Sequence, residues 1–280
     1  MKKVSLILFT ILSQAAVGTF WVLMIIQVFF ASETGENLIS FSLMLTTIMM
    51  ICSLLIALGH LGSPLIAFKA IRHVRNSWLS REVILASAFA GLCLVTTYLH
   101  YFQSGLSNTH TGTAWVTAII GFMFIYSMGK LYMLKTVSWW NSMLTPLSFY
   151  LTTTVLGGLL INLFLMMGTT GNTMAEPFAL ISKGVLLILT FEMVLIQIRV
   201  TRLFSGSNVQ KGFAQSFMDQ FGQLFYLRLG MSLLGFVFLA IMLFTHRFNL
   251  GLYLIPFILL VFAEFLGRYL FYAEQKSSAL

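Results

Sequence analysis

Charged residues are scarce in this sequence: they make up 9% of its 280 positions, against a hydrophobic fraction of 59%, and the mean hydropathy is +0.93. Soluble domains carry about 25% charged residues, because a globule needs a polar surface to face water. Prolines number only four, which disfavours a loop-rich sheet protein. The alternating segments of about ten residues that mark a membrane β-barrel are absent as well. These shortages exclude a water-soluble domain and predict a protein embedded in a membrane as helices.

Metal-binding and haem-binding side chains are also in short supply. The two cysteines, Cys52 and Cys93, each lie in an apolar stretch and are interpreted as small buried residues. An iron–sulfur cluster usually takes four thiolates, and a structural zinc site takes four Cys or His ligands at close spacing. A b-type haem needs two imidazoles at matching depth on facing helices, and only His100 and His246 approach that condition. We therefore expect no iron–sulfur cluster, metal site or haem in this protein.

Long apolar runs occupy almost the whole sequence. A bilayer core roughly 30 Å thick needs about 20 apolar residues per helix. Eight segments meet this need, at about 5–30, 38–60, 82–103, 113–134, 147–168, 178–199, 227–247 and 249–272. The sequence thus predicts an all-α fold, a polytopic membrane bundle of eight transmembrane helices that forms a single integral membrane domain over residues 1–280. Longer connections are expected at 61–81, 135–146 and 200–226.

The basic residues are distributed very unevenly between the two membrane faces that this topology defines. One face collects Lys2, Lys3, Lys69, Arg72, Arg75, Arg81, Lys130, Lys135, Arg199, Arg202, Lys211, Arg228, Arg268 and Lys276, whereas the other has Lys183 and Arg247. Fourteen against two predicts, by the positive-inside rule, cytoplasmic termini and a multi-pass protein of the bacterial inner membrane. Basic loops are ordinary in membrane proteins, so the net charge of +8 does not indicate nucleic-acid binding.

The connection at 61–81 has a helical pattern of its own. Ser63 can cap a helix with Pro64 at its first position. The apolar residues Leu65, Phe68, Ile71, Val74 and Trp78 recur at helical spacing, opposite Lys69, Arg72 and Arg75. This pattern predicts a helix in the membrane interface, with its cations toward lipid head groups or an acidic partner protein. A lipid-facing loop helix without a partner is the alternative.

Ionisable groups at membrane depth are costly and are therefore candidates for function. His60 ends the second span and Glu82 opens the third, so both lie at the same membrane face. Imidazole titrates near neutrality, and partial burial can bring a carboxyl group into the same range. The two side chains could accept the protons that a quinol releases on oxidation. Alternatively, His60 bonds a loop carbonyl and Glu82 merely favours a helix N-terminus.

The later spans contain further charges. Lys183 and Glu192 lie nine residues apart, roughly 13 Å along one helix, too far to pair with each other. Glu264 and Arg268 stand at i and i+4, which predicts an intrahelical pair whose network could include Arg228. A secondary transporter that uses Lys183, Glu192 and Glu264 is the alternative function. Gly157-Gly158 in the fifth span is expected to permit close helix packing.

Four stretches, in order, resemble the membrane anchor subunit family of bacterial dimethyl sulfoxide reductase-type molybdoenzymes. They are His60-Leu61-Gly62-Ser63-Pro64 with Ala67-Phe68 and Leu79-Ser80-Arg81-Glu82; Tyr132 with Trp140-Asn141 and Leu144-Thr145-Pro146-Leu147-Ser148-Phe149; Gly157-Gly158; and Ala263-Glu264-Phe265-Leu266-Gly267-Arg268-Tyr269-Leu270-Phe271-Tyr272. The number of spans and the overall length agree as well, so the likeness covers essentially the whole sequence.

The resemblance implies an anchor that holds a molybdopterin-containing catalytic subunit and an iron–sulfur electron-transfer subunit at the membrane during anaerobic respiration. Such an anchor has no haem, oxidises menaquinol and passes the electrons to the iron–sulfur subunit. The family's quinol-binding and proton-accepting histidine and glutamate fall on His60 and Glu82. Ser63, Arg81, Glu264 and Arg268 are possible supporting residues, and Lys69, Arg72 and Arg75 are expected to contact the partner or lipid.

Overall fold

The computed structural model describes residues 2–30, 35–61, 74–102, 107–133, 140–168 and 175–277. Within these ranges the protein forms helices α1 (Lys2–Phe29), α2 (Glu36–Leu61), α4 (Trp78–Phe102), α5 (Ser107–Leu131), α6 (Leu144–Gly168), α7 (Ala175–Ser205), α8 (Asn208–Thr245) and α9 (Leu250–Ser277). Eight helices of the described part are long and apolar enough to cross a membrane. The predicted all-α membrane bundle with eight spans is confirmed.

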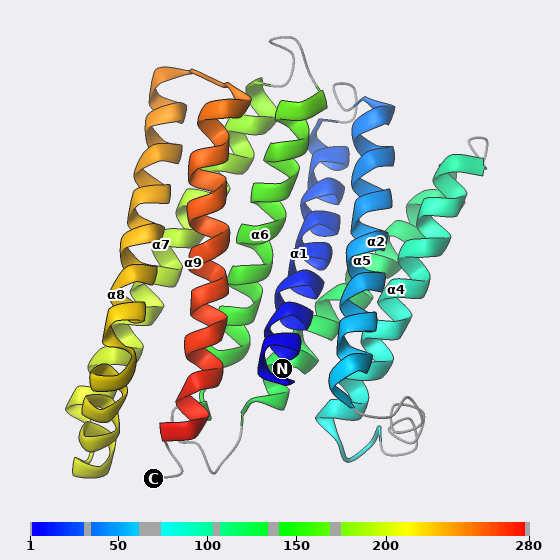
Figure 1. Ribbon diagram of the computed structural model, residues 1–280. Coiled ribbons are helices and arrows are strands. Elements are labelled where there is room, and N and C mark those ends of the chain that lie inside the picture. The colour runs from blue at the N-terminus through cyan, green and yellow to red at the C-terminus, as the bar shows by residue number, and fades with distance from the viewer. Residues whose placement is uncertain are drawn as a thin grey trace.

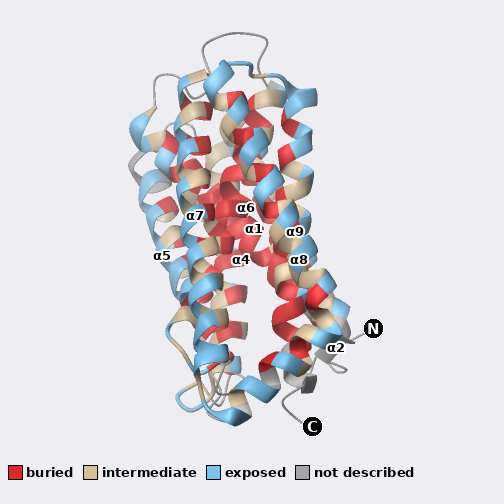
Figure 2. Cartoon of the chain, turned by 90° about the vertical axis from the view of Figure 1, so that its left-hand side faces the viewer, coloured by how far each residue is buried: buried red, intermediate tan, exposed pale blue. Residues whose placement is uncertain are grey.

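The helices run antiparallel to one another, and α1 and α6 lie at the centre of the bundle (Figure 1). Helices α2, α4 and α5 lie on one side of this pair, and α7, α8 and α9 lie on the other. Both termini lie at the same end of the bundle, the end that the sequence predicts to carry most Lys and Arg; we call it the basic end. Buried residues follow the central axis, and exposed residues face outward, where lipid would lie (Figure 2).

The two central helices approach each other closely at a pair of glycines. A Cβ atom on Gly157 of α6 would lie 2.1 Å from the carbonyl carbon of Gly18 in α1, and one on Gly18 would lie 1.9 Å from the carbonyl oxygen of Thr153. Only glycine allows this backbone-to-backbone contact. Gly158 instead faces Val185 of α7. The prediction that Gly157-Gly158 permits close helix packing is confirmed.

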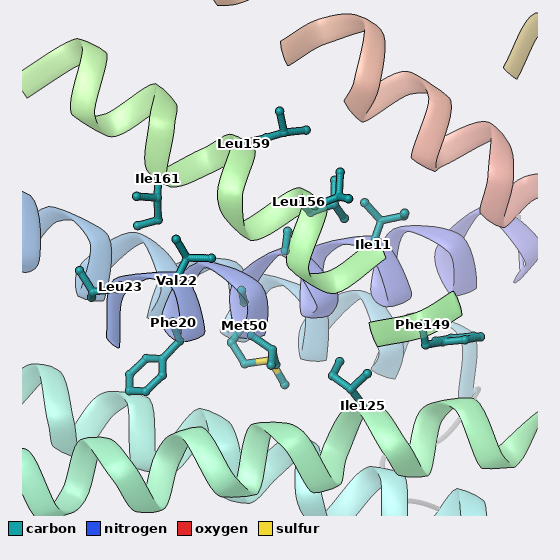
Figure 3. Close-up of a cluster of buried hydrophobic side chains, with 14 of the residues drawn as sticks. Ile11, Phe20, Val22, Leu23, Met50, Ile125, Phe149, Leu156, Leu159 and Ile161 are labelled. Atoms are coloured by element: carbon teal, nitrogen blue, oxygen red, sulfur yellow. The ribbon is translucent and has the colours of Figure 1, made fainter. Parts of the chain in front are cut away.

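Large apolar side chains fill the space around this crossing. Phe20 and Leu23 of α1, Met50 of α2 and Ile125 of α5 are all 1% exposed or less and point into one interior (Figure 3). Buried polar side chains then link helices by hydrogen bonds: Gln14 Nε2 donates to the carbonyl of Phe149 at 2.8 Å, and the Tyr253 hydroxyl donates to the carbonyl of Leu159 at 2.8 Å. Such bonds hold helices together where hydrophobic burial adds little.

The expected long connection at 200–226 is wrong. Helix α7 continues to Ser205, and α8 begins at Asn208 after a two-residue break. Ser207 caps α8 with a capping box: its hydroxyl accepts from the Gln210 backbone N–H, and the Gln210 side chain accepts from the Ser207 N–H. A Ser-x-x-Gln motif marks a helix start even in polar sequence, whereas hydropathy alone detects only the apolar part.

Two smaller expectations also need correction or fall outside the described residues. Cys93 is buried as expected, but Cys52 is exposed, because it lies on the outer side of α2, where lipid rather than protein would cover it. The predicted interface helix at 61–81 lies mostly in residues 62–73, outside the described ranges. Of its remaining residues, Val74 and Arg75 form a turn, and Trp78 begins α4.

Candidate functional site

Glu82 is a buried carboxyl group at the basic end of the bundle. Helix α4 begins four residues earlier, at Trp78, so Glu82 lies one turn inside the helix rather than at its start. The residue is 4% exposed, and its Oε1 has no hydrogen-bond partner in the part of the protein that the structure describes. Burying an ionisable group without a partner costs several kcal/mol, at least about 2. That cost makes Glu82 a strong candidate for function.

The surroundings of Glu82 are aromatic. Burial raises the pKa of Tyr132 well above its usual value, and the neighbouring Tyr272 and the charge of Glu82 raise it further. The rings of Tyr132 and Tyr272 lie 5.2 Å apart, and Tyr132 also packs against Trp140, Phe149 and Phe271. The Tyr272 hydroxyl is buried and makes no hydrogen bond of normal geometry among the described residues. Tyr132 and Tyr272 were not among the predicted site residues, although both fall in the stretches that carry the family resemblance.

His60 belongs to the last turn of α2, and its side chain lies outside the described part of the structure. Helix α2 packs against α4, and the end of α2 that carries His60 is the same end of the bundle as the start of α4 (Figure 1). The backbone arrangement therefore agrees with a common membrane face for His60 and Glu82, and the contact between their side chains stays a prediction. Ser63, Lys69 and Arg72 also lie outside the described residues.

Arg81 closes the segment that leads into α4. Its Nε donates to the carbonyl of Val74 at 2.9 Å, and its Nη2 donates to the carbonyl of Arg75 at 2.7 Å. The guanidinium also lies 4.2 Å from the centre of the Trp78 ring, a favourable cation–π position. Arg81 thus holds the start of α4, and with it Glu82, in place. Arg75 itself is exposed and is open to lipid or a partner protein.

A second group of charged residues surrounds a cavity between α6, α7, α8 and α9. Arg228 of α8 forms an ion pair with Glu192 of α7, with Nη2 and Oε1 2.6 Å apart. The hydroxyl of Thr152 donates to Glu264 Oε2 at 2.8 Å. The cavity is lined by these four residues and by Ser148, Leu195, Ile196, Arg199, Val200, Phe204, Ala214, Phe217, Met218, Phe225, Gly267, Arg268, Leu270 and Phe271.

The predicted pair between Glu264 and Arg268 is not among the ion pairs within 4.0 Å of the described residues, where Arg228–Glu192 is found instead. Glu264 is turned toward Thr152 of α6. The Arg268 guanidinium lies 3.7 Å from the centre of the Phe149 ring and donates to the carbonyl of Ser148 at 3.3 Å. Contacts to a neighbouring helix have therefore replaced the intrahelical pair. The expectation that Arg228 joins the network of Glu264 and Arg268 agrees with the cavity that all three line.

The histidines considered for haem have other positions. His100 Nε2 is 2.8 Å from the hydroxyl of Ser40. His246 is the exposed C-terminal cap of α8, with a left-handed φ of 51°. Helices α4 and α8 lie on opposite flanks of the bundle (Figure 1). No group of three or more His, Cys, Asp or Glu residues in the described ranges could hold a metal ion.

Comparisons with known proteins agree on one family. The family model for the DMSO reductase anchor subunit (DmsC) matches residues 1–273. The protein is 29% identical over 276 residues to an anaerobic dimethyl sulfoxide reductase chain of Haemophilus influenzae, covering 96% of this sequence and 94% of the relative. It is 28% identical over 278 residues to the anaerobic dimethyl sulfoxide reductase chain of the same designation in Escherichia coli, covering 95% and 93%. It is also 29% identical over 183 residues to the E. coli anaerobic dimethyl sulfoxide reductase chain YnfH, covering 63% and 62%. The protein therefore belongs to the DMSO reductase anchor subunit (DmsC) family.

Proposed function

We propose that this protein is the menaquinol-oxidising anchor of an anaerobic respiratory reductase complex of the dimethyl sulfoxide reductase type. It lies in the bacterial inner membrane and holds an iron–sulfur electron-transfer subunit and a molybdopterin-containing catalytic subunit. The clusters and the molybdopterin belong to those partners, and the anchor supplies the quinol site. Family membership supports the role of anchor, and the basic end of the bundle offers the partner an exposed cation at Arg75.

The observation that carries the proposal is the buried Glu82 carboxyl group, whose Oε1 has no hydrogen-bond partner in the described part of the protein. Oxidation of a quinol removes two electrons and two protons. In the proposed mechanism, the head group hydrogen-bonds to His60, and Glu82 accepts a proton as a general base. The electrons pass to the iron–sulfur subunit. Arg81 acts as a positioning residue, because it fixes the backbone just before Glu82.

The test is quinol oxidation in membranes that carry the assembled complex. Replacing the proton acceptor in Glu82→Gln, or the head-group partner in His60→Ala, should lower turnover by about 10²- to 10⁴-fold, the usual contribution of a positioned acid or base. Partner subunits should remain bound in both variants. Glu36→Gln is the matched control, since Glu36 is exposed in the first turn of α2 at the opposite end of the bundle. Unchanged turnover in both His60→Ala and Glu82→Gln would remove these residues from the mechanism.

The transporter alternative meets a geometric difficulty. It needs Lys183, Glu192 and Glu264 to serve one pathway. Glu192 and Glu264 line the same cavity, whereas Lys183 is exposed on α7 and is not part of the lining. Purification in mild detergent separates the two functions: an anchor retains iron- and molybdenum-bearing partners, and a transporter moves solute in vesicles without them.

A further inference from the structure

The cavity between α6, α7, α8 and α9 contains a pair of buried carboxyl groups that the proposed quinol site does not use. Glu192 is 5% exposed and Glu264 is 3% exposed. The two groups come from different helices and lie close enough to interact electrostatically. Two carboxyl groups so close in a low-dielectric site hold a proton between them more readily than they hold two full charges. The pair is therefore suited to take up and release a proton.

Two polar atoms in the cavity lack partners among the described residues: Glu192 Oε2 and Arg228 Nε. One is an acceptor and the other a donor, and their side chains are joined by the ion pair. Water can satisfy both, because it donates and accepts. The cavity volume is about 80 Å³, and one water needs roughly 10–15 Å³ of such space. The cavity has room for several waters beside the carboxyl pair.

The shape of the cavity leads from these carboxyl groups toward the basic end. Its lining follows α7 from Glu192 to Phe204, twelve residues or about 18 Å along the helix. Phe204, Phe217 and Phe225 supply apolar walls along this length. A column of water in this space would reach from the carboxyl pair to the membrane surface.

A line of polar side chains also runs from Glu82 toward the cavity. The charge of Glu82 acts on Tyr132, and so does the charge of Arg268. Tyr272, next to Tyr132, has a buried hydroxyl without a well-oriented partner in the described ranges, which is a common sign of an internal water. Arg268 lines the cavity together with Glu264.

We propose that this cavity is the proton exit of the quinol site: a proton taken up by Glu82 passes by way of Tyr272 and internal water to the Glu192–Glu264 pair, and then through the cavity water to the basic end. This inference rests on the proposed function for the source of the proton. The step is a proton transfer alone. Each carboxylate that receives a proton releases one to water, and the two electrons of the quinol leave separately through the partner subunit.

Gly267 gives Arg228 its position beside the pair. A Cβ atom on Gly267 would lie 2.6 Å from Arg228 Cζ and 2.7 Å from its Nε, so glycine lets the guanidinium lie flat on α9. Arg228 in turn stabilises the charged form of Glu192, and it balances the cavity after the proton has left. Gly267 and Arg228 are thus positioning residues for the carboxyl pair.

The experiment compares Glu192→Gln, Glu264→Gln and Gly267→Ala in the assembled complex. Quinol oxidation is measured in H₂O and D₂O, and quinol-site binding is measured by fluorescence quenching of heptyl-hydroxyquinoline N-oxide. We expect the two carboxyl variants to lower turnover by about tenfold or more, with a larger solvent isotope effect and unchanged inhibitor affinity, because proton transfer becomes limiting while the quinol site stays intact. Gly267→Ala should act in the same direction with a smaller loss. Glu176→Gln is the control, an exposed glutamate in the first turn of the same helix α7.

The outcomes separate this inference from the proposed function. If Glu82→Gln stops turnover while both carboxyl-pair variants keep the wild-type rate and isotope effect, the exit route is wrong and the quinol site stands. If Glu82→Gln and His60→Ala also leave turnover unchanged, the proposed function itself fails. Infrared spectra of the wild-type complex test the route without any variant: a protonated carboxyl band should shift promptly in D₂O, and a band that does not exchange would overturn a water-filled cavity.

Discussion

The contact between Gly18 and Gly157 allows a quantitative test of how the two central helices pack. In Gly157→Ala, the new Cβ would lie 2.1 Å from the carbonyl carbon of Gly18, whereas carbon atoms in good contact are about 3.5–4.0 Å apart. The helices must therefore separate by about 1.4 Å at the crossing. Backbone forms the obstacle, so no rotation of a side chain relieves it. We expect a loss near the upper end of the usual overpacking range of about 1–3 kcal/mol.

The assay is thermal unfolding of the detergent-solubilised protein, followed by tryptophan fluorescence. Gly157→Ala should lower the melting temperature by several degrees, since about 1 kcal/mol corresponds to roughly 2–4 °C for a protein of 150–250 residues. Gly184→Ala in α7 is the matched control, because a Cβ there meets nothing within 4 Å, and alanine favours a helix by about 0.5–1 kcal/mol over glycine. Equal melting temperatures for the two variants would refute the packing argument.

Two further predictions concern the cavity region and the start of α8. Arg228→Met should lower the free energy of unfolding by about 3–5 kcal/mol, because it leaves Glu192 charged, buried and without its ion-pair partner; the double variant with Glu192→Gln should recover most of that loss in the same thermal assay, and no recovery would contradict the pairing. Ser207→Ala should cost about 1 kcal/mol by removing the capping box, visible as faster amide hydrogen exchange in the first turn of α8. Exchange that stays slow there would show that the cap contributes little.

The membrane fold was predictable from the sequence because the lipid phase imposes a simple rule. Each crossing needs a long apolar run, and the eight runs were found. The rule fails where a helix leaves the lipid, since polar residues then carry no hydropathy signal. Helix α8 extends from Asn208, well before the apolar segment expected at 227, and its Ser207-x-x-Gln210 cap was the local signal for that start.

The site was predictable only in part. Glu82 was selected because an ionisable group near the membrane is costly, and the structure places it in a buried position. Its aromatic neighbours come from α9 and from the segment between α5 and α6, so their meeting depends on tertiary packing that local patterns do not encode. The Glu264–Arg268 pair was wrong for the same reason: the i, i+4 rule counts partners on one helix, and Thr152 and Phe149 on α6 compete for both side chains.

Helix α6 connects the two polar regions of the molecule. Its Phe149 packs in the aromatic group beside Glu82, and its Ser148 and Thr152 line the cavity on the other side. One to two turns further along, Gly157 locks α6 against α1, and Gln14 of α1 holds the carbonyl of Phe149. A separation of about 1.4 Å at that crossing would therefore shift both regions together. Proton transfer depends on hydrogen-bond distances, so Gly157→Ala should slow quinol oxidation even where the complex still assembles, and normal turnover in a destabilised but assembled complex would show that α6 does not set this geometry.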